Sequence, residues 1–168
     1  MKKILLISDT HNYLDLQLTK HIQAADEVWH AGDIGTLELC HSIERIKPLR
    51  GVFGNADGQD IRLTYPETLI FDCEALKVYV THIGGYPGKY PSKIKAALKE
   101  ARPGLFICGH SHILKVMYDK ELQLLHMNPG ACGVHGFHVM KTALRFEVQE
   151  AEIKNLAVIE LGKRTSLT

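Results

Sequence analysis

The sequence lacks the long apolar runs of membrane and secreted proteins. A membrane-spanning helix takes roughly 18 consecutive apolar residues, and the first apolar run here covers only Ile4–Ile7. A secretory signal needs a run of at least about 7 apolar residues. We therefore expect no signal peptide and no membrane partner, and we expect a cytoplasmic protein.

An excess of charge is also absent, because the formal net charge is only +1 over 168 residues. Binding along DNA or RNA depends on concentrated positive charge. The sequence therefore disfavours nucleic acid as a partner and a nuclease as the activity.

Paired cysteines are missing too. The four cysteines are Cys40, Cys73, Cys108 and Cys132, and no two of them form a C-x-x-C pair. This spacing argues against a structural zinc knuckle or a disulfide framework. We predict four buried thiols in a reducing compartment.

What remains is an ordinary globular composition with 45% hydrophobic residues. This length suits one domain with a sizeable core, spanning residues 1–168. No linker, repeat or low-complexity segment divides the chain, and a homo-oligomer stays open.

Strands and helices are predicted to alternate in the first third of the chain. The expected order is strand Ile4–Ile7, a helical stripe from Leu14 to Ala25, strand Asp26–His30, a helix from Leu37 to Ile46 before Pro48, and strand Gly51–Phe53. This order is typical of α/β units with parallel strands.

The rest of the chain is richer in strands. We predict hairpins at Thr68–Thr81 and Val116–Met127, a helix capped by Ser92 and ending near Ala101, a strand Leu105–Cys108, and two strands within Ala143–Leu161. A core of strands with helices outside is the simplest arrangement.

Polar residues of metal-ligand type directly follow five of the predicted strands. They are Asp9, His11, Asp33, Asn55, His82, His110 and His112. In such sheets, ligands bind beyond the carboxyl ends of the strands. Each residue alone is also compatible with a turn or a helix cap. All seven together are far better explained by one shared site.

The chemistry of this set indicates two metals. Four imidazoles, two carboxylates and one amide are too many donors for one tetrahedral ion. They suit two five- or six-coordinate ions that share Asp33, with Mn²⁺ preferred and Fe, Co²⁺, Ni²⁺ or Zn²⁺ also suitable. Two such ions hydrolyse phosphate esters through a bridging hydroxide that attacks phosphorus. We therefore predict a phosphoesterase, most readily a phosphodiesterase.

Glycines support the same site. Gly32, Gly54 and Gly109 each precede a proposed ligand. A missing Cβ allows a tight turn or a close backbone approach at these strand ends.

The ordered motifs resemble those of the calcineurin-like metallophosphoesterases. They are D-T-H at Asp9–His11, G-D at Gly32–Asp33, G-N-x-D at Gly54–Asp57, T-H at Thr81–His82 and G-H-S-H at Gly109–His112. The N-P-G of Asn128–Gly130 is most similar to the small bacterial and archaeal phosphodiesterase branch. The resemblance covers residues 1 to about 135. It implies a four-layer αββα sandwich of two mixed β-sheets flanked by helices.

The resemblance also implies which residues bind each metal. One metal would take Asp9, His11, Asp33 and His112, and the other would take Asp33, Asn55, His82 and His110. Asp33, Asn55 and His82 are the expected catalytic residues. Two positions depart from the family pattern. Ala56 stands where many members have a proton-donating histidine, and Gly84 stands where this branch often has a second histidine.

Substrate contacts are predicted at Lys89, Asn128 and His135. Lys89 lies in the segment from Gly84 to Tyr90, which is either a surface loop or a wall of the active site. The alternative to an enzyme is an interaction scaffold with little activity, as in the retromer subunit that resembles this branch.

Overall fold

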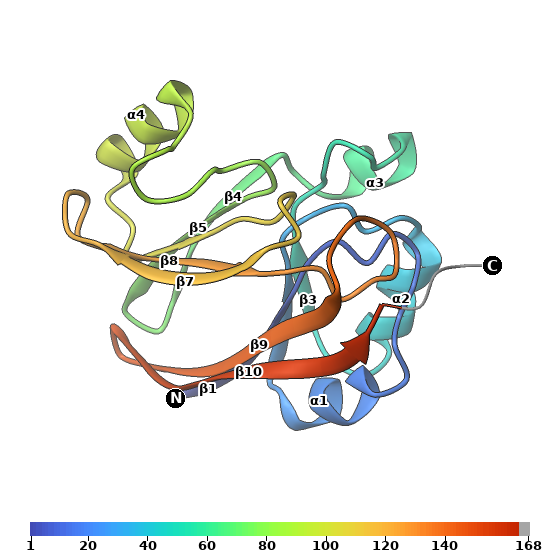
Figure 1. The fold of residues 1–168 in the computed structure, drawn as a ribbon. Coiled ribbons are helices and arrows are strands. Elements are labelled where there is room, and N and C mark those ends of the chain that lie inside the picture. Colours follow the sequence, from blue (N-terminus) through green and yellow to red (C-terminus); the bar gives the residue numbers. More distant parts are fainter. Residues whose placement is uncertain (165–168) are drawn as a thin grey trace.

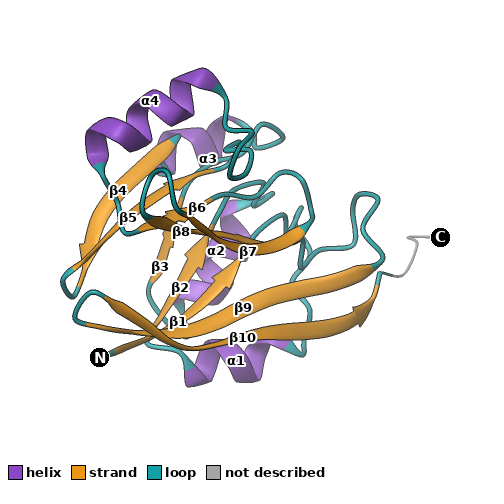
Figure 2. Cartoon of the chain, turned by 60° about the vertical axis from the view of Figure 1, so that its left-hand side comes forward, coloured by secondary structure: helices purple, strands orange, loops and turns teal. Residues whose placement is uncertain are grey.

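Two five-stranded mixed sheets pack face to face, with helices on their outer sides (Figure 1, Figure 2). The computed structural model describes residues 1–164. This architecture confirms the αββα sandwich that the sequence motifs implied.

The first sheet contains both ends of the described chain. Its strands are β1 Lys2–Ile7, β2 Glu27–His30, β3 Leu49–Gly51, β9 Met140–Gln149 and β10 Glu152–Lys163. Their order is β10-β9-β1-β2-β3, with β1, β2 and β3 parallel, and with β9 antiparallel to both of its neighbours, β1 and β10. The two strands predicted in the tail are confirmed as the antiparallel pair β9 and β10.

The second sheet is built from the middle of the chain. Its strands are β4 Thr68–Cys73, β5 Leu76–Thr81, β6 Leu105–Ile107, β7 Leu114–Asp119 and β8 Leu124–Pro129. Their order is β4-β5-β6-β8-β7, with β5, β6 and β8 parallel. Strands β4 and β7 run antiparallel at the two edges, which confirms both predicted hairpins.

Burial on both faces explains the unbroken apolar run of β1. Leu5 and Ile7 face the outer helices, whereas Ile4 and Leu6 face the space between the two sheets. Successive side chains of a strand point to opposite faces, so a strand covered on both sides needs apolar residues throughout.

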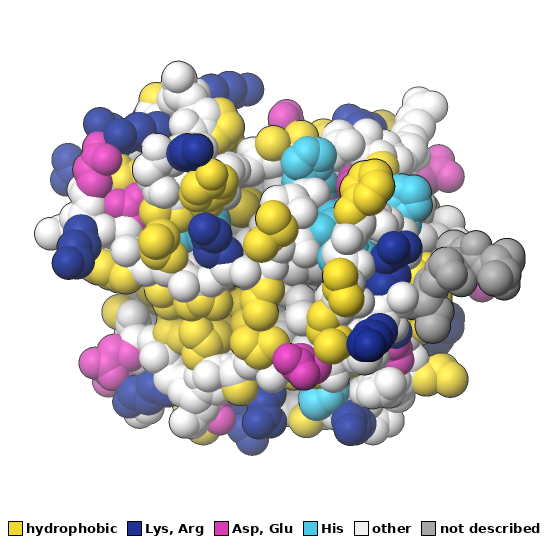
Figure 3. All heavy atoms as spheres, viewed as in Figure 1, with side chains coloured by type: hydrophobic (Ala, Val, Ile, Leu, Met, Phe, Trp, Pro, Cys, Tyr) yellow, Lys and Arg dark blue, Asp and Glu magenta, His cyan; other side chains and the backbone are white. Residues whose placement is uncertain are grey.

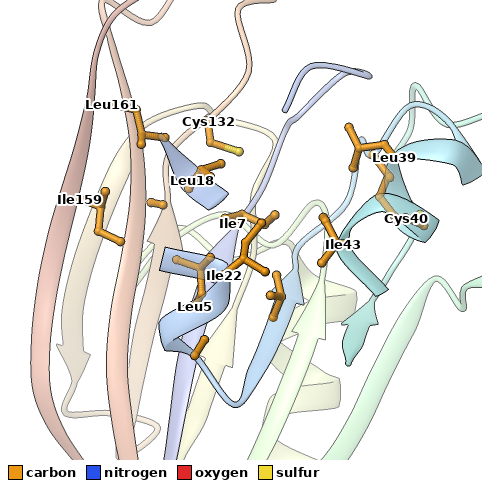
Figure 4. Close-up of a cluster of buried hydrophobic side chains, with 14 of the residues drawn as sticks. Leu5, Ile7, Leu18, Ile22, Leu39, Cys40, Ile43, Cys132, Ile159 and Leu161 are labelled. Carbon is orange, nitrogen blue, oxygen red and sulfur yellow. The ribbon is translucent and has the colours of Figure 1, made fainter. Parts of the chain in front are cut away.

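Within the described part of the chain, four helices complete the outer layers. They are α1 Leu18–Ala24, α2 Leu37–Glu44, α3 Gln59–Thr64 and α4 Ser92–Ala101. Leu18, Ile22 and Ile43 pack with β1 on the outer side of the first sheet (Figure 4). Leu98 of α4 packs on Tyr79 and Phe106 of the second sheet.

Several predicted boundaries were wrong. Helix α1 begins at Leu18 rather than at Leu14, and Leu16 is 88% exposed. The preceding residues remain a loop, in which Asp15 accepts a hydrogen bond from the backbone of Gln17. The apparent helical stripe therefore joined a loop to a short helix.

Three smaller differences concern other elements. The cap of α4 is Pro91, and no side chain caps the helix, so the predicted Ser92 cap was wrong. Strand β3 lies two residues before the predicted Gly51–Phe53, because the chain leaves the ladder after Gly51. The short helix α3 was not predicted.

The four cysteines are buried free thiols, as predicted. Within residues 1–164, none of the helices combines the length and the apolar character that crossing a bilayer requires.

Candidate metal centre

The candidate ligands lie on loops that follow five strands. Asp9 and His11 follow β1, Asp33 follows β2, Asn55 follows β3, His82 follows β5, and His110 and His112 follow β6. Hydrogen bonds join these loops to one another, both within one sheet and between the two sheets. Within the first sheet, the amide of Asp9 donates to Gly32 O at 3.0 Å. Between the two sheets, the amide of His110 donates to Asp9 Oδ2 at 3.2 Å. The strand ends of both sheets therefore meet at one edge of the sandwich.

Five of the seven candidates have a left-handed backbone. The φ angles of Asp9, His11, Asp33, His110 and His112 lie between 44° and 67°. A non-glycine residue in this region costs about 1–3 kcal/mol and is found most often at functional sites. The surrounding loops hold these residues in this backbone conformation, which sets the direction of their side chains.

Close backbone approach explains two of the glycines, as predicted. A Cβ on Gly54 would lie 2.1 Å from Asp33 Oδ1, and a Cβ on Gly109 would lie 2.1 Å from Ser8 Oγ. No larger residue fits at either position without displacing the loop beside it.

The carboxylates and imidazoles form two adjoining groups. One group contains Asp9, His11 and His112, and the other contains Asp33, His82 and His110. Within each group, the potential ligand atoms lie within 4.8 Å of one another. Six of the seven candidate ligands therefore lie in one or the other of these two groups.

Asp33 belongs to the second group and also lies close to the first. Its Oδ1 accepts a hydrogen bond from the backbone of Ala56 at 2.8 Å. Its Oδ2 lies 3.6 Å from His11 Nε2 and 3.2 Å from His82 Nε2. A single carboxylate oxygen therefore faces one histidine of each group.

Three buried polar atoms of the site have no hydrogen-bond partner among the described residues. They are Asp9 Oδ1, His11 Nε2 and His82 Nε2. Buried polar atoms are almost always paired, so three unpaired atoms in one place point to a binding site. The other oxygen of Asp9 accepts hydrogen bonds from Ser8 Oγ and the backbone of His110. Carboxylate and imidazole donors without sulfur fit divalent cations.

Hydrogen bonds on the far side of two rings fix the direction of their lone pairs. His82 Nδ1 lies 2.7 Å from Ala31 O and donates to it, so Nε2 can present its lone pair to the site. His138 Nε2 donates to Gly133 O at 2.9 Å, which leaves His138 Nδ1 as an acceptor. His112 Nδ1, 3.3 Å away, donates to that acceptor and turns His112 Nε2 toward Asp9.

The site favours negative carboxylates beside cationic partners. Although burial disfavours its charge, the nearby His82 ring and the backbone amide of Ala56 hold the pKa of Asp33 at about 2. Burial opposes the charge of His82, but the nearby carboxylates of Asp33 and Asp9 outweigh it and raise the pKa of His82. Such a centre attracts positive charge and can exchange a proton for a metal ion.

Asn55 lies on an exposed loop that two residues brace. The Asp57 carboxylate accepts hydrogen bonds from the backbones of Gly35 and Gly54, both at 2.8 Å. Arg62 donates to the carbonyls of Asp57 at 2.7 Å, Asn55 at 3.1 Å and Gly54 at 3.2 Å. Sequence reasoning did not find Arg62, because its contacts are all with backbone atoms and it lies on a helix that was not predicted.

Two hollows open beside the site and share Asn55. The first has a volume of about 480 Å³, and its lining includes His11, Asp33, Asn55, His110, His112 and His135. The second has a volume of about 390 Å³ and extends from Asn55 and His82 toward Arg62 and α4. Figure 3 shows several histidine side chains gathered beside hydrophobic ones on this face of the molecule.

The predicted substrate contacts lie in different surroundings. His135 lines the first hollow, with its ring 4.7 Å from that of His11. Asn128 is buried and bonds through its side chain to Gly109 O and Ser111 Oγ, so it braces the loop of His110. Lys89 is exposed and lies 6.0 Å from the ring of Tyr86, outside the lining of both hollows as the described residues define it.

The fold and the donor set together define a metallophosphoesterase-type site on an αββα sandwich. Residues 1–151 match the calcineurin-like phosphoesterase superfamily domain. The chain belongs to this superfamily.

Similar proteins occur in archaea, bacteria and eukaryotes. A probable metallophosphoesterase of Methanothermobacter thermautotrophicus is 24% identical over 131 residues, which cover 75% of this chain and 74% of that protein. A structure described as a novel archaeal phosphodiesterase superposes with a TM-score of 0.71 at 24% identity, covering 94% of this chain and 99% of the other. Vps29 of Entamoeba histolytica, solved with Zn²⁺, gives a TM-score of 0.71 at 14% identity, covering 95% of this chain and 99% of the other. These two structures have the same fold as this chain.

Proposed function

We propose that this protein is a phosphodiesterase that uses two divalent metal ions. Asp9, His11, Asp33 and His112 would bind one ion, and Asp33, Asn55, His82 and His110 would bind the other. The observation that carries the proposal is the position of Asp33 Oδ2, which faces both His11 and His82. When bound, two such cations acidify water and offset the charge on phosphoryl oxygens.

The residues of the chain contribute direction and rigidity. Ala31 and His138 hold the lone pairs of His82 and His112 toward the site. Asp57 and Arg62 hold the loop of Asn55, which borders both hollows. We propose Asp33, Asn55 and His82 as the residues nearest the reacting phosphorus. Preorganised polar groups of this kind need not rearrange during the reaction.

A diester fits the site better than a monoester. The two hollows leave room for an organic group on each side of Asn55. A phosphodiester carries two such groups, whereas a monoester carries one. Among metals, Mn²⁺ suits the mixture of imidazole, carboxylate and amide donors, and Fe, Co²⁺, Ni²⁺ and Zn²⁺ are the alternatives. The four buried thiols accord with the reducing cytoplasm as the location.

Asp33→Asn tests the proposal, because it removes the negative charge that lies between the two groups. Metal analysis of the purified variant should show loss of bound metal, and bis(p-nitrophenyl) phosphate hydrolysis should fall by at least about a thousandfold. Glu38→Gln on α2, an exposed carboxylate outside the site, is the control. Unchanged metal content and turnover in Asp33→Asn would contradict the bridging role.

An interaction scaffold is the second candidate. Val116, Met117 and Tyr118 on the edge strand β7 are 40%, 46% and 58% exposed, and the fold is shared with Vps29. Two bound metals without hydrolysis of phosphodiesters or monoesters would favour this candidate.

A further inference from the structure

The second hollow is a groove that leads away from the metal centre toward the outer helices. Its lining includes Tyr79 and Thr81 of β5, and Ile94 and Ala97 of α4. Both α3 and α4 lie on the same side of the molecule as the start of β4 and the end of β5 (Figure 2). We call this hollow the α4 groove.

The groove is continuous with the proposed catalytic site. His82 and Asn55 line it, and both are proposed metal ligands. An organic group bonded to a phosphorus at the metals can therefore enter the groove directly.

The lining favours an uncharged, flat group. Phe53 presents an aromatic ring, and Arg62 lies over that ring at 4.5 Å. The guanidinium of Arg62 already donates to three backbone carbonyls, so its donors are largely committed. Exposed Lys93 and Glu67 carry opposite charges. The groove therefore offers apolar and aromatic surface without a strong excess of positive charge for a second anion.

We propose that the α4 groove binds an aryl or heteroaryl ester group of the substrate. The proposal rests on the proposed phosphodiesterase function, since the phosphate must lie at the metal centre. The volume of about 390 Å³ is within the range of small-molecule sites and accommodates a phenyl or nucleobase ring. The first hollow would take the second ester group.

Binding of two phosphonates to the Mn²⁺-loaded protein tests the groove separately from catalysis. Phenylphosphonate and methylphosphonate both offer a phosphoryl group, and neither carbon–phosphorus bond is hydrolysed. Isothermal titration calorimetry should show that the wild-type protein binds phenylphosphonate about tenfold more tightly, because the ring buries apolar surface.

Variants of α4 locate the ring. Ala97→Trp fills the groove, and Ile94→Ala removes part of its wall without adding bulk. Both should reduce the preference for phenylphosphonate severalfold while metal content stays the same. Ala96→Trp places the same side chain on an exposed position outside the groove lining and should keep the preference. If Ala97→Trp does not fold, Ile94→Ala decides the question.

The possible failures are distinguishable. Equal affinity of the wild-type protein for both phosphonates, or an undiminished preference in the groove variants, would overturn the groove and leave the phosphate site intact. Absence of phosphonate binding together with absence of phosphodiester hydrolysis would reject the proposed function, and the groove assignment with it.

Discussion

His112 and His138 form a direct ring-to-ring contact, with their Nδ1 atoms 3.3 Å apart. The second nitrogen of His138 bonds to Gly133 O, and the second nitrogen of His112 lies 3.1 Å from Asp9 Oδ1. The chain of contacts therefore runs from the backbone to a proposed metal ligand. Partners behind a ligating histidine commonly fix its orientation and its tautomer.

Removing this support should weaken metal binding. We expect His138→Ala to lower the affinity for Mn²⁺ about 10- to 100-fold, as other losses behind ligating histidines do. His138→Gln keeps one acceptor and one donor and should restore part of the affinity. Calorimetric titration with Mn²⁺ measures both effects. His41→Ala, at an exposed position on α2, is the control, and equal affinity in His138→Ala would refute the role.

Arg62 should stabilise the loop of Asn55 through its hydrogen bonds rather than through its positive charge. Arg62→Lys keeps the positive charge but loses the planar fork that reaches three carbonyls. We expect weaker binding of the second Mn²⁺ equivalent and a loss of about 1 kcal/mol in the free energy of unfolding. Chemical denaturation and metal titration measure the two. Arg45→Lys is the matched control, and a variant with both properties unchanged would show that the loop stands without Arg62.

Because Ala56 stands near the site, we predict that the rate of hydrolysis depends strongly on the leaving group. This side chain lines the first hollow and cannot donate a proton. Aryl diesters release a phenolate, which can leave without being protonated. They should therefore react much faster than alkyl diesters. Ala56→His should raise the rate for alkyl diesters by about tenfold or more, since general acids contribute most to poor leaving groups. An equal change for aryl and alkyl diesters would argue against this explanation.

His126 should make the fold sensitive to acid. Its ring is 1% exposed, and neither ring nitrogen has a hydrogen-bond partner among the described residues. Burial, aided by nearby Lys115, lowers the pKa of His126 from 6.5 to about 4, although Asp119 opposes this shift. The unfolded chain therefore binds a proton first as the pH falls below 6.5. The neutral His126 ring therefore contributes fully to the stability of the folded state above pH 6.5, and this contribution is lost as the pH falls toward 4.

Denaturation curves between pH 7 and pH 4 test this prediction. For this one group, the free energy of unfolding should fall by up to about 1.4 kcal/mol per pH unit. His126→Phe should flatten the dependence, whereas His41→Phe should leave it unchanged. Parallel curves for wild type and His126→Phe would show that this histidine does not titrate in the expected range.

The sequence predicted the strands well where both faces are buried or where two strands form a hairpin. The run Ile4–Ile7 and the pair Thr68–Thr81 show such patterns plainly. Short helices were harder to predict, because tertiary packing decides them. Only Ile61 of α3 is buried, so the helix leaves almost no periodic signal.

The candidate ligands could be predicted because each follows an apolar strand, and two groupings of them are seen in the structure. The supporting residues could not be predicted in the same way. His138 acts through His112, and Arg62 acts through carbonyl oxygens that every residue possesses. Such roles depend on distances between loops, which spacing along the chain does not specify.

Anomalous diffraction from crystals soaked in Mn²⁺ tests the central claim most directly. We predict two peaks, one touching His11 and His112 and the other touching His82 and His110, with Asp33 in contact with both. A single peak at full occupancy, or two peaks away from Asp33, would contradict the shared metal centre.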